Sequence, residues 1–390
     1  MAERSGPSRI IACILVGLGA FLLAAALLIP TYTVSKLKKT PLDLEVTTIA
    51  EGKGEVLDAK SLTAGKAVVN TDVPLVAQRY VTVVDPSDAD RITVQAGQTL
   101  RRTDKQGDTG LLTATVDRVT ADRVTSMPIQ DPVGTIQTEA NKPAEEVEHT
   151  GLQYKWPFDA EQKSYPYFDI NARASKDIDF VEETEINGMK VYHYNQKVGP
   201  VDLSKVVASP TNKLSLPAET WGVEGGTAPI TMTRWYTNER DVWVDPITGV
   251  VVKGQEKLYQ YYARSGDKPE VTVLKATLPF NEDTIEYQIG QAKDGQDKLA
   301  MFGRTVPIIA GILGVISLIA GIFLGTRGGR GPKPAVEGGA PVAPAPAAGP
   351  HPGEYSEPDT EMIPRHDYTT DQTVEIPQVK PDQDPPTTRL

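Results

Sequence analysis

The chain has 390 residues, a hydrophobic content of 39% and a formal net charge of −11. This composition is sufficient for a folded core, and so acidic a chain is a poor candidate for binding nucleic acid. The single cysteine, Cys13, excludes an intrachain disulfide, and the sequence has no Asn-x-Ser/Thr sequon. Secreted eukaryotic domains of this size usually carry cysteines or sequons, so we expect a bacterial envelope protein.

Two apolar segments are long enough to cross a bilayer. They are IIACILVGLGAFLLAAALLI, residues 10–29, and VPIIAGILGVISLIAGIFLG, residues 306–325. About 20 residues rising about 1.5 Å each match a hydrocarbon core of ~30 Å. The first run exceeds the apolar core of a typical signal peptide and has no clear cleavage site, so we predict an uncleaved anchor.

Both apolar segments carry small residues at four-residue spacing, which lets helix backbones approach closely. The pairs are Ala20 with Ala24, and Gly321 with Gly325. Two interpretations stay open. The pairs either mediate packing of the two helices or a homodimer, or they reflect the ordinary composition of membrane helices.

The orientation follows from the short flanks, because long domains cross the membrane largely regardless of their charge. Basic residues precede the first span and follow the second, which places both ends in the cytoplasm. We therefore predict a two-pass plasma-membrane protein with a large exterior domain. Its parts are a cytoplasmic N-terminus (1–9), a transmembrane helix (10–29), an exterior β-rich domain (30–305), a second transmembrane helix (306–325) and a Pro-rich, disordered cytoplasmic tail (326–390).

The exterior segment contains many strand-length runs separated by turn residues. We predict hairpin turns at residues 52–54, at Asn187–Gly188 and at residues 245–249. Helical spacing is confined to residues 283–303 and, more weakly, to residues 203–208. The sequence therefore predicts a mainly β (α+β) domain, an antiparallel sheet or a barrel-like one, held between two transmembrane helices.

Sequence motifs of the common enzyme classes are missing. HExxH, GxSxG, the P-loop and GxGxxG do not occur. His149 and His193 lie far apart, and His193 alternates with tyrosines as on an ordinary strand face. The DxD at 177–179 lacks a nucleotide-binding context, and DPSDAD at 85–90 lacks the glycine and distal glutamate of an EF-hand, which favours a solvated turn. We therefore predict a protein without enzymatic activity, with no catalytic residue, no cofactor and no metal.

Aromatic residues concentrate in the stretch from Tyr154 to Tyr262. Within YKWPF, Tyr154, Trp156 and Phe158 alternate and share one face if this run is extended. One interpretation is a packed core of aromatic cross-strand pairs; the other is an apolar groove or tunnel that holds a ligand. The candidate ligand-binding residues of such a cavity are Tyr154, Trp156, Phe158, Tyr167, Trp235, Trp243 and Tyr261.

The order of these segments resembles a known family. The first span, GLQYKWPFDAEQKSYPYFD (151–169), RDVWVDPITGVVV (240–252) and DKLAMFGRTVPIIAGILGVI (297–316) together resemble the actinobacterial porin PorA-like envelope family, over roughly residues 8–325. The resemblance implies a plasma-membrane protein that, in mycolic-acid bacteria, supports maturation of lipomannan into lipoarabinomannan. The plan also resembles the class B scavenger receptors, which pass lipids through a tunnel, and it differs from the β-barrel of outer-membrane porins.

From these observations we expect a protein that binds or transfers lipid or lipoglycan precursors on the outer side of the plasma membrane. The alternative is a non-catalytic scaffold or accessory subunit of envelope glycosyltransferases. An enzyme or a signalling receptor is a third class. The expected partners are a lipid or lipoglycan ligand, the membrane, envelope glycosyltransferases and a second copy of the chain. A continuous apolar cavity would favour the first function, and a filled core the second.

Overall fold

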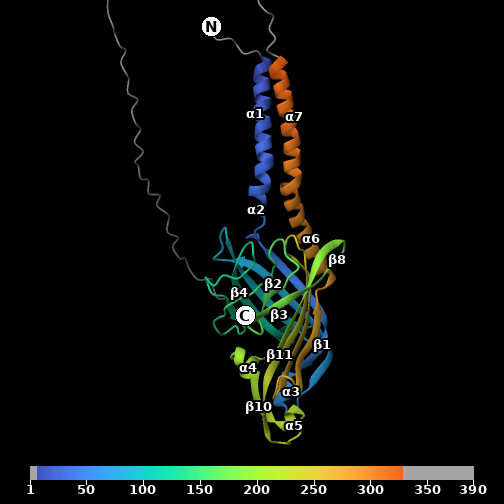
Figure 1. The fold of residues 1–390 in the computed structure, drawn as a ribbon. Coiled ribbons are helices and arrows are strands. Elements are labelled where there is room, and N and C mark those ends of the chain that lie inside the picture. The colour runs from blue at the N-terminus through green and yellow to red at the C-terminus, as the bar shows by residue number, and fades with distance from the viewer. Residues whose placement is uncertain (1–6, 328–390) are drawn as a thin grey trace, which may run out of the picture. The chain divides into compact units, whose positions relative to one another are not determined.

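The computed structural model describes residues 7–327 (Figure 1). Most of the predicted N-terminal segment 1–9 and nearly all of the predicted tail 326–390 lie outside these residues. Helical elements stand at both ends of the described chain: α1 (Pro7–Leu28), η1 (Ile29–Thr33) and α2 (Val34–Leu37) at the start, and α6 (Glu282–Ala300), η4 (Met301–Thr305) and α7 (Val306–Arg327) at the end.

Helices α1 and α7 lie side by side (Figure 1), and both are apolar apart from the basic ends at Arg9 and Arg327. Each is long and apolar enough to cross a membrane, and only 11% and 17% of the two apolar windows are buried inside the protein. A core helix of a soluble protein would be mostly buried. Exposed side chains such as Ile14, Phe21, Ile312 and Ile316 are therefore suited to contact lipid tails.

Glycines set the closeness of α1 and α7. A Cβ on Gly19 would lie 2.8 Å from the Gly314 carbonyl oxygen, and one on Gly321 would lie 2.9 Å from the Ala12 carbonyl oxygen. Ala20 and Ala24 are exposed on the outer side of α1. The predicted packing of small residues therefore holds for Gly321, whereas on α1 the contact is made by Gly19, one position before the predicted pair.

Between the helices, the described chain forms one antiparallel sheet of thirteen strands. The strands are β1 (Glu45–Leu57), β2 (Val69–Val84), β3 (Arg91–Arg102), β4 (Leu111–Asp122), β5 (Thr135–Gln137), β6 (Glu145–Glu146), β7 (Tyr165–Asp169), β8 (Ala174–Ile186), β9 (Met189–Asp202), β10 (Lys213–Pro217), β11 (Pro229–Val244), β12 (Val251–Ala263) and β13 (Val271–Pro279). Short helices stand in the connections: α3 (Ala59–Thr63), η2 (Gly107–Gly110), α4 (Leu203–Val206), η3 (Pro210–Asn212) and α5 (Ala218–Trp221).

The strand order is β6-β5-β4-β3-β2-β1-β13-β12-β11-β9-β8-β7, and β10 pairs with β11. The first and last long strands of the domain, β1 and β13, are neighbours, so the two ends of the β region meet in the middle of the sheet. Strands β6 and β7 form the two edges and do not pair with each other in the described residues. The predicted mainly β, antiparallel fold is confirmed as an open sheet, not as a closed barrel.

The turn predictions had different outcomes. Asn187 and Gly188 have φ of 48° and 76° and connect β8 to β9, as a two-residue hairpin requires, and the turn at residues 245–249 connects β11 to β12. The predicted hairpin at residues 52–54 is wrong, because β1 runs straight through it. A Cβ on Gly52 would lie 2.2 Å from the Thr277 carbonyl oxygen, so glycine here permits the close approach of β13.

Helix α6 packs on the sheet through the predicted apolar positions. Ile285, Ile289 and Ala292 are buried in a cluster with Val252 of β12. The helix begins after Asn281, whose side-chain oxygen accepts a hydrogen bond of 3.0 Å from the Thr284 amide. Because α6 continues through η4 into α7, this packing fixes the sheet to the base of the helix pair.

Candidate functional site

A partly open cavity of about 650 Å³ lies on one face of the sheet. Seven consecutive strands of the order given above, from β4 through β1 and β13 to β11, contribute to its wall. Laid flat, seven strands at about 4.8 Å spacing would be roughly 29 Å wide. The sheet must therefore curve around the cavity, as its strand twist allows.

The wall of the cavity is mostly apolar. Strands contribute alternate side chains to one face, and the inward positions are filled by branched residues such as Val46, Val81, Ile92, Val94, Leu258 and Leu278. The last part of the wall comes from the two helices beside the membrane segments. Lys36 and Leu37 of α2 and Lys298 and Leu299 of α6 line the cavity, which therefore adjoins the base of the α1–α7 pair.

Three of the seven predicted ligand-binding residues, Tyr154, Phe158 and Tyr167, line this cavity. Trp156 does not, although it stands between two of them. It is fully buried in the core, with its ring 5.3 Å from the rings of both Tyr167 and Tyr194. The YKWPF run is not an extended strand, so the expected single aromatic face does not form.

Trp235, Trp243 and Tyr261 also lie outside the cavity wall. In β11, Arg240 and Val242 point into the cavity. Side chains alternate between the two faces of a strand, and Trp235 and Trp243 lie an odd number of positions from Val242, so both point to the opposite face. Trp243 instead stacks on His193 at 4.5 Å, and Trp235 covers Gly266. The hydroxyl of Tyr261 donates to the carbonyl of the same glycine. Ligand contact by the three cavity-lining aromatics remains a prediction.

An ion-pair network occupies one side of the cavity. Arg240 donates to Glu256 at 2.7 Å and to Asp169 at 3.1 Å, and it lies 4.9 Å from the centre of the Tyr167 ring. Burial disfavours the charge of Arg240, but the two carboxylates outweigh it and hold the pKa of the guanidinium well above its usual range. This arginine is therefore neutralised by the protein itself.

A second buried network lies behind Tyr154. Asp117 accepts hydrogen bonds from His149 Nε2 at 2.9 Å, from Gln153 Nε2 at 2.9 Å and from the Tyr154 hydroxyl. Burial and the neighbouring Asp117 carboxylate raise the pKa of Tyr154 well above its usual value. Sequence reasoning missed this cluster, because His149 and Tyr154 lie 32 and 37 positions from Asp117 and no local pattern connects them.

Two further cations face the cavity without a carboxylate partner. Lys155 donates to the Trp156 carbonyl oxygen at 2.9 Å, and its Nζ lies 3.9 Å from the centre of the Phe158 ring. Burial lowers the pKa of Lys155 from 10.5 to about 7. Arg79 of β2 lies over the Tyr154 ring at 5.6 Å, and its buried Nε has no hydrogen-bond partner. Neither residue stood out in the sequence.

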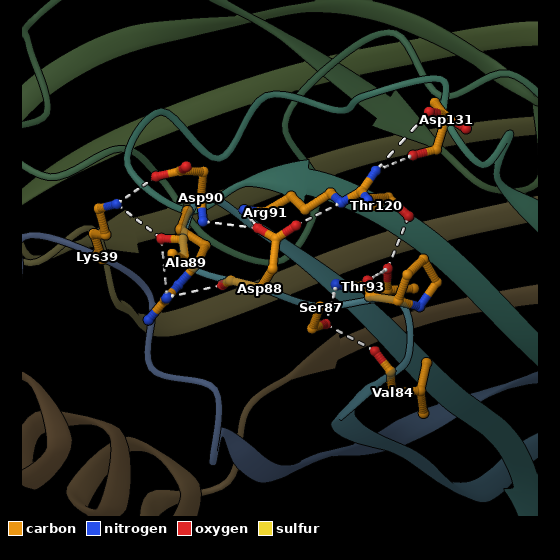
Figure 2. A network of polar contacts seen from close by, with 12 residues as sticks. Lys39, Val84, Ser87, Asp88, Ala89, Asp90, Arg91, Thr93, Thr120 and Asp131 are labelled. Atoms are coloured by element: carbon orange, nitrogen blue, oxygen red, sulfur yellow. Dashed lines mark hydrogen bonds and ion pairs between the residues drawn. The ribbon is translucent and has the colours of Figure 1, made fainter. Parts of the chain in front are cut away.

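The acidic turn at residues 85–90 joins β2 to β3, and the carboxylates of Asp88 and Asp90 accept from donors of the chain (Figure 2). Asp88 Oδ1 accepts from the amides of Asp90 and Arg91 at 2.9 and 3.0 Å, and Asp90 Oδ1 accepts from Lys39 at 2.7 Å. The sequence-based choice of a turn over a cation loop agrees with these contacts. Over residues 7–327, no cluster of three or more His, Cys, Asp or Glu side chains is arranged to hold a metal ion.

The remaining polar residues considered in the sequence lie away from the cavity. Asp177 and Asp179 are exposed on β8, and Asp179 accepts a 2.7 Å hydrogen bond from Ser164. His193 points to the opposite side from the buried Tyr194, as its strand alternation predicts, and its Nε2 lies 3.0 Å from Asp241. The geometry does not assemble these groups into one reacting site.

Comparisons with known proteins identify relatives of this chain. The family model described as Porin PorA matches residues 11–323. A protein named Porin PorA from Corynebacterium resistens is 33% identical over 400 aligned positions, which cover 82% of this chain and 97% of the relative. A second Porin PorA, from Corynebacterium amycolatum, is 29% identical over 377 positions, covering 80% of this chain and 97% of the relative.

These matches correct the function expected from the sequence. The relatives carry the name of pore proteins, so the expectation of a lipid- or lipoglycan-transfer protein that supports lipoarabinomannan maturation is wrong. The scaffold alternative and the likeness to scavenger receptors find no support in them either. The family and the two apolar helices together identify a membrane protein. With a family match over most of its length, the chain belongs to the Porin PorA family.

Proposed function

We propose that this chain is a non-enzymatic, porin-type protein whose cavity receives small solutes at the outer surface of the plasma membrane. The observation that carries the proposal is the position of the cavity, because its wall includes α2 and α6 directly at the base of the two apolar helices. A volume of about 650 Å³ lies within the range of cavities that hold small molecules. The name of the relatives favours solute passage over catalysis.

The proposed arrangement in the membrane has two passes. Helices α1 and α7 cross the bilayer, the β domain lies outside, and both ends of the chain lie in the cytoplasm. Support comes from the basic residues on the two short outer flanks, such as Arg9 and Arg327, which outweigh the lysines at the domain side because a long domain crosses the membrane largely regardless of its charge.

Passage through the bilayer requires more than one copy of the chain in this proposal. Gly19 and Gly314 bring α1 and α7 so close that a single added Cβ would collide with the backbone of the neighbouring helix. No solute fits between helices packed in this way. We therefore place the path between copies, with a cavity of each copy at its outer end and an oligomer as the active form.

The proposal is tested by reconstituting the full chain into liposomes loaded with a small neutral sugar and measuring its efflux. We expect efflux above that of protein-free liposomes, rising more steeply than in proportion to protein density because copies must assemble. Planar bilayers should show discrete conductance steps. Efflux equal to that of protein-free liposomes at every protein density would rule the proposal out.

The role of the cavity is tested by filling it. Thr115 of β4 lines the cavity, whereas its neighbour Ala114 is exposed on the other face of the strand. Thr115→Trp should reduce efflux strongly, and Ala114→Trp is the matched control that adds the same indole outside. Equal efflux from both variants would show that solutes do not pass through the cavity.

A further inference from the structure

The wall of the cavity carries basic side chains that the described chain does not pair with carboxylates. Four basic residues of its wall, Lys36, Arg79, Lys155 and Lys298, form no ion pair within residues 7–327, and a fifth, Arg123, donates only to backbone carbonyl oxygens. Of the lining carboxylates, Glu256 is paired with Arg240, and Asp122 accepts from the amides of Val124 and Thr125. Among the described residues, Asp122 and Asp294 are the lining carboxylates that remain to offset these basic side chains. The excess of basic residues in the cavity contrasts with the chain as a whole, whose net charge is −11.

The unpaired cations lie at two depths. Lys36 and Lys298 stand on α2 and α6, beside the membrane helices. Arg79 lies deeper in the cavity. The membrane-side end of β1 is Glu45, which pairs with Thr82 of β2, and Arg79 pairs with Thr48, three residues further along β1. Three residues along a strand correspond to roughly 10 Å. A solute that enters beside the helices therefore meets cations first at the mouth and again inside.

The local chemistry at Arg79 leaves its guanidinium available. It donates no hydrogen bond to the described chain, and its Nε is sealed from solvent without a partner. The neighbouring Tyr154 hydroxyl is already committed to Asp117. A buried donor without an acceptor is unfavourable by itself, so an anionic acceptor bound here would satisfy a group that the fold leaves open.

Lys155 is also a buried donor without an anionic partner in the described chain. Its one hydrogen bond goes to the Trp156 carbonyl oxygen, and apolar surroundings disfavour its charge. Asp245 of the β11–β12 turn acts on Lys155 from a distance. The other charged residues that line the cavity are Lys36, Lys39, Arg79, Asp122, Arg123, Arg240, Glu256, Asp294 and Lys298. An anion beside Lys155 would favour its protonated form.

We propose that the cavity selects singly charged organic anions with an apolar body, and that Arg79 and Lys155 contact the anionic group. This inference rests on the proposed function and names the class of solute. The apolar strands accommodate the body of the solute, and a cleft with low-dielectric walls strengthens the attraction between its cations and an anion. A neutral solute of the same shape gains only the apolar contact, and a cation is repelled.

The test uses three probes with one body: 4-phenylbutyrate, 4-phenylbutanol and 4-phenylbutylamine. Binding to the full chain in lipid nanodiscs is measured by titration calorimetry, with empty nanodiscs as the reference. We expect the carboxylate to bind about tenfold more tightly than the alcohol, the scale of a hydrogen bond to a charged group, and the amine more weakly than either. Equal affinity of carboxylate and alcohol would overturn the inference.

Variants separate the two contacts. Arg79→Gln and Lys155→Met should each lower carboxylate affinity about tenfold while leaving the affinity for 4-phenylbutanol unchanged, which also shows that the variants fold. Lys190→Gln is the control, because this lysine is exposed, pairs with Glu183 and lies outside the cavity. A loss in the control as large as in the two variants would contradict a local anion site.

Proton uptake and liposome efflux distinguish a failure of the anion-site inference from a failure of the proposed function. Titrations at pH 7.5 in buffers of different ionisation enthalpy should reveal proton uptake with the carboxylate, absent in Lys155→Met, because the bound anion reprotonates this lysine. Liposome efflux is measured separately. Selective anion binding without any efflux would overturn the proposed function alone, whereas efflux without anion preference would overturn this inference alone.

Discussion

His149 Nε2 lies 2.9 Å from Asp117 Oδ1, and both side chains are fully buried. The other ring nitrogen, Nδ1, lies 2.8 Å from the Val147 carbonyl oxygen. Both nitrogens thus face oxygen acceptors, and a neutral imidazole has only one N–H to donate. The Tyr154 hydroxyl donates to Asp117, so the buried pair fixes the position of a tyrosine that lines the cavity.

Replacing His149 should therefore destabilise the fold. In His149→Phe, a buried Asp117 loses one of its hydrogen-bond donors, and we expect a loss of about 3 kcal/mol in the free energy of unfolding. Urea unfolding of the full chain in detergent measures it. His193→Phe is the control, because Asp241 and His193 are both partly exposed whereas Asp117 and His149 are fully buried, so the loss should stay below about 1 kcal/mol. Equal losses would contradict the role assigned to the buried pair.

Lys155 makes stability depend on pH. Its pKa is about 7 in the folded chain, against 10.5 for an ordinary lysine. Below pH 7 the lysine is charged in both states and the unfavourable burial of its charge is fully present. Between about pH 7 and pH 10.5 the unfolded chain holds a proton that the folded chain lacks, so the contribution of Lys155 to stability rises with pH.

Lys155→Met should accordingly be more stable than the parent chain at pH 6, and this advantage should shrink as the pH approaches 10. Denaturant midpoints measured across this range report it. The exposed Lys190 offers a comparison, since Lys190→Met should show no gain at pH 6. An advantage for Lys155→Met that stays constant from pH 6 to pH 10 would mean that the lysine is not held in its neutral form.

The close packing of α1 and α7 depends on Gly19. A Cβ at this position would lie 2.6 Å from the Leu318 side chain, whereas one on Gly17 would meet nothing within 4 Å. Gly19→Leu should separate the helices and Gly17→Leu should not. The measurement is disulfide formation between Ala12→Cys and Gly325→Cys in a Cys13→Ala background, because their Cβ positions are 3.7 Å apart. Undiminished cross-linking in Gly19→Leu would contradict the packing.

The two-pass arrangement predicts which cysteines react on intact cells. In a Cys13→Ala background, Gln106→Cys in the exposed β3–β4 connection should react with a thiol reagent that does not cross membranes. A cysteine placed in the Pro-rich tail, Ala345→Cys, should react only after the cells are permeabilised. The reverse pattern would place the β domain in the cytoplasm.

Properties that depend on neighbouring residues could be predicted from the sequence. The length of an apolar run determines whether a helix can cross a bilayer, and the predicted spans 10–29 and 306–325 lie within helical segments. Asn187–Gly188 formed the predicted turn, because positive φ at two successive residues is a local requirement. The buried positions of α6 followed from helical periodicity in the same way.

The tertiary structure alone decided what depends on residues far apart in the chain. From the sequence, Gly52 is predicted to be a turn residue. In the structure it lets strand β13 approach closely at Thr277, which lies more than 200 positions away in the chain. Tyr154 and Trp156 have the same chemical character in the sequence, but one lines the cavity and the other fills the core. The unpaired cations are recognisable only when every ion pair is known. A side chain becomes part of a cavity or of a core through the curvature of the sheet and the pairing of distant strands, and neither is encoded in a local pattern.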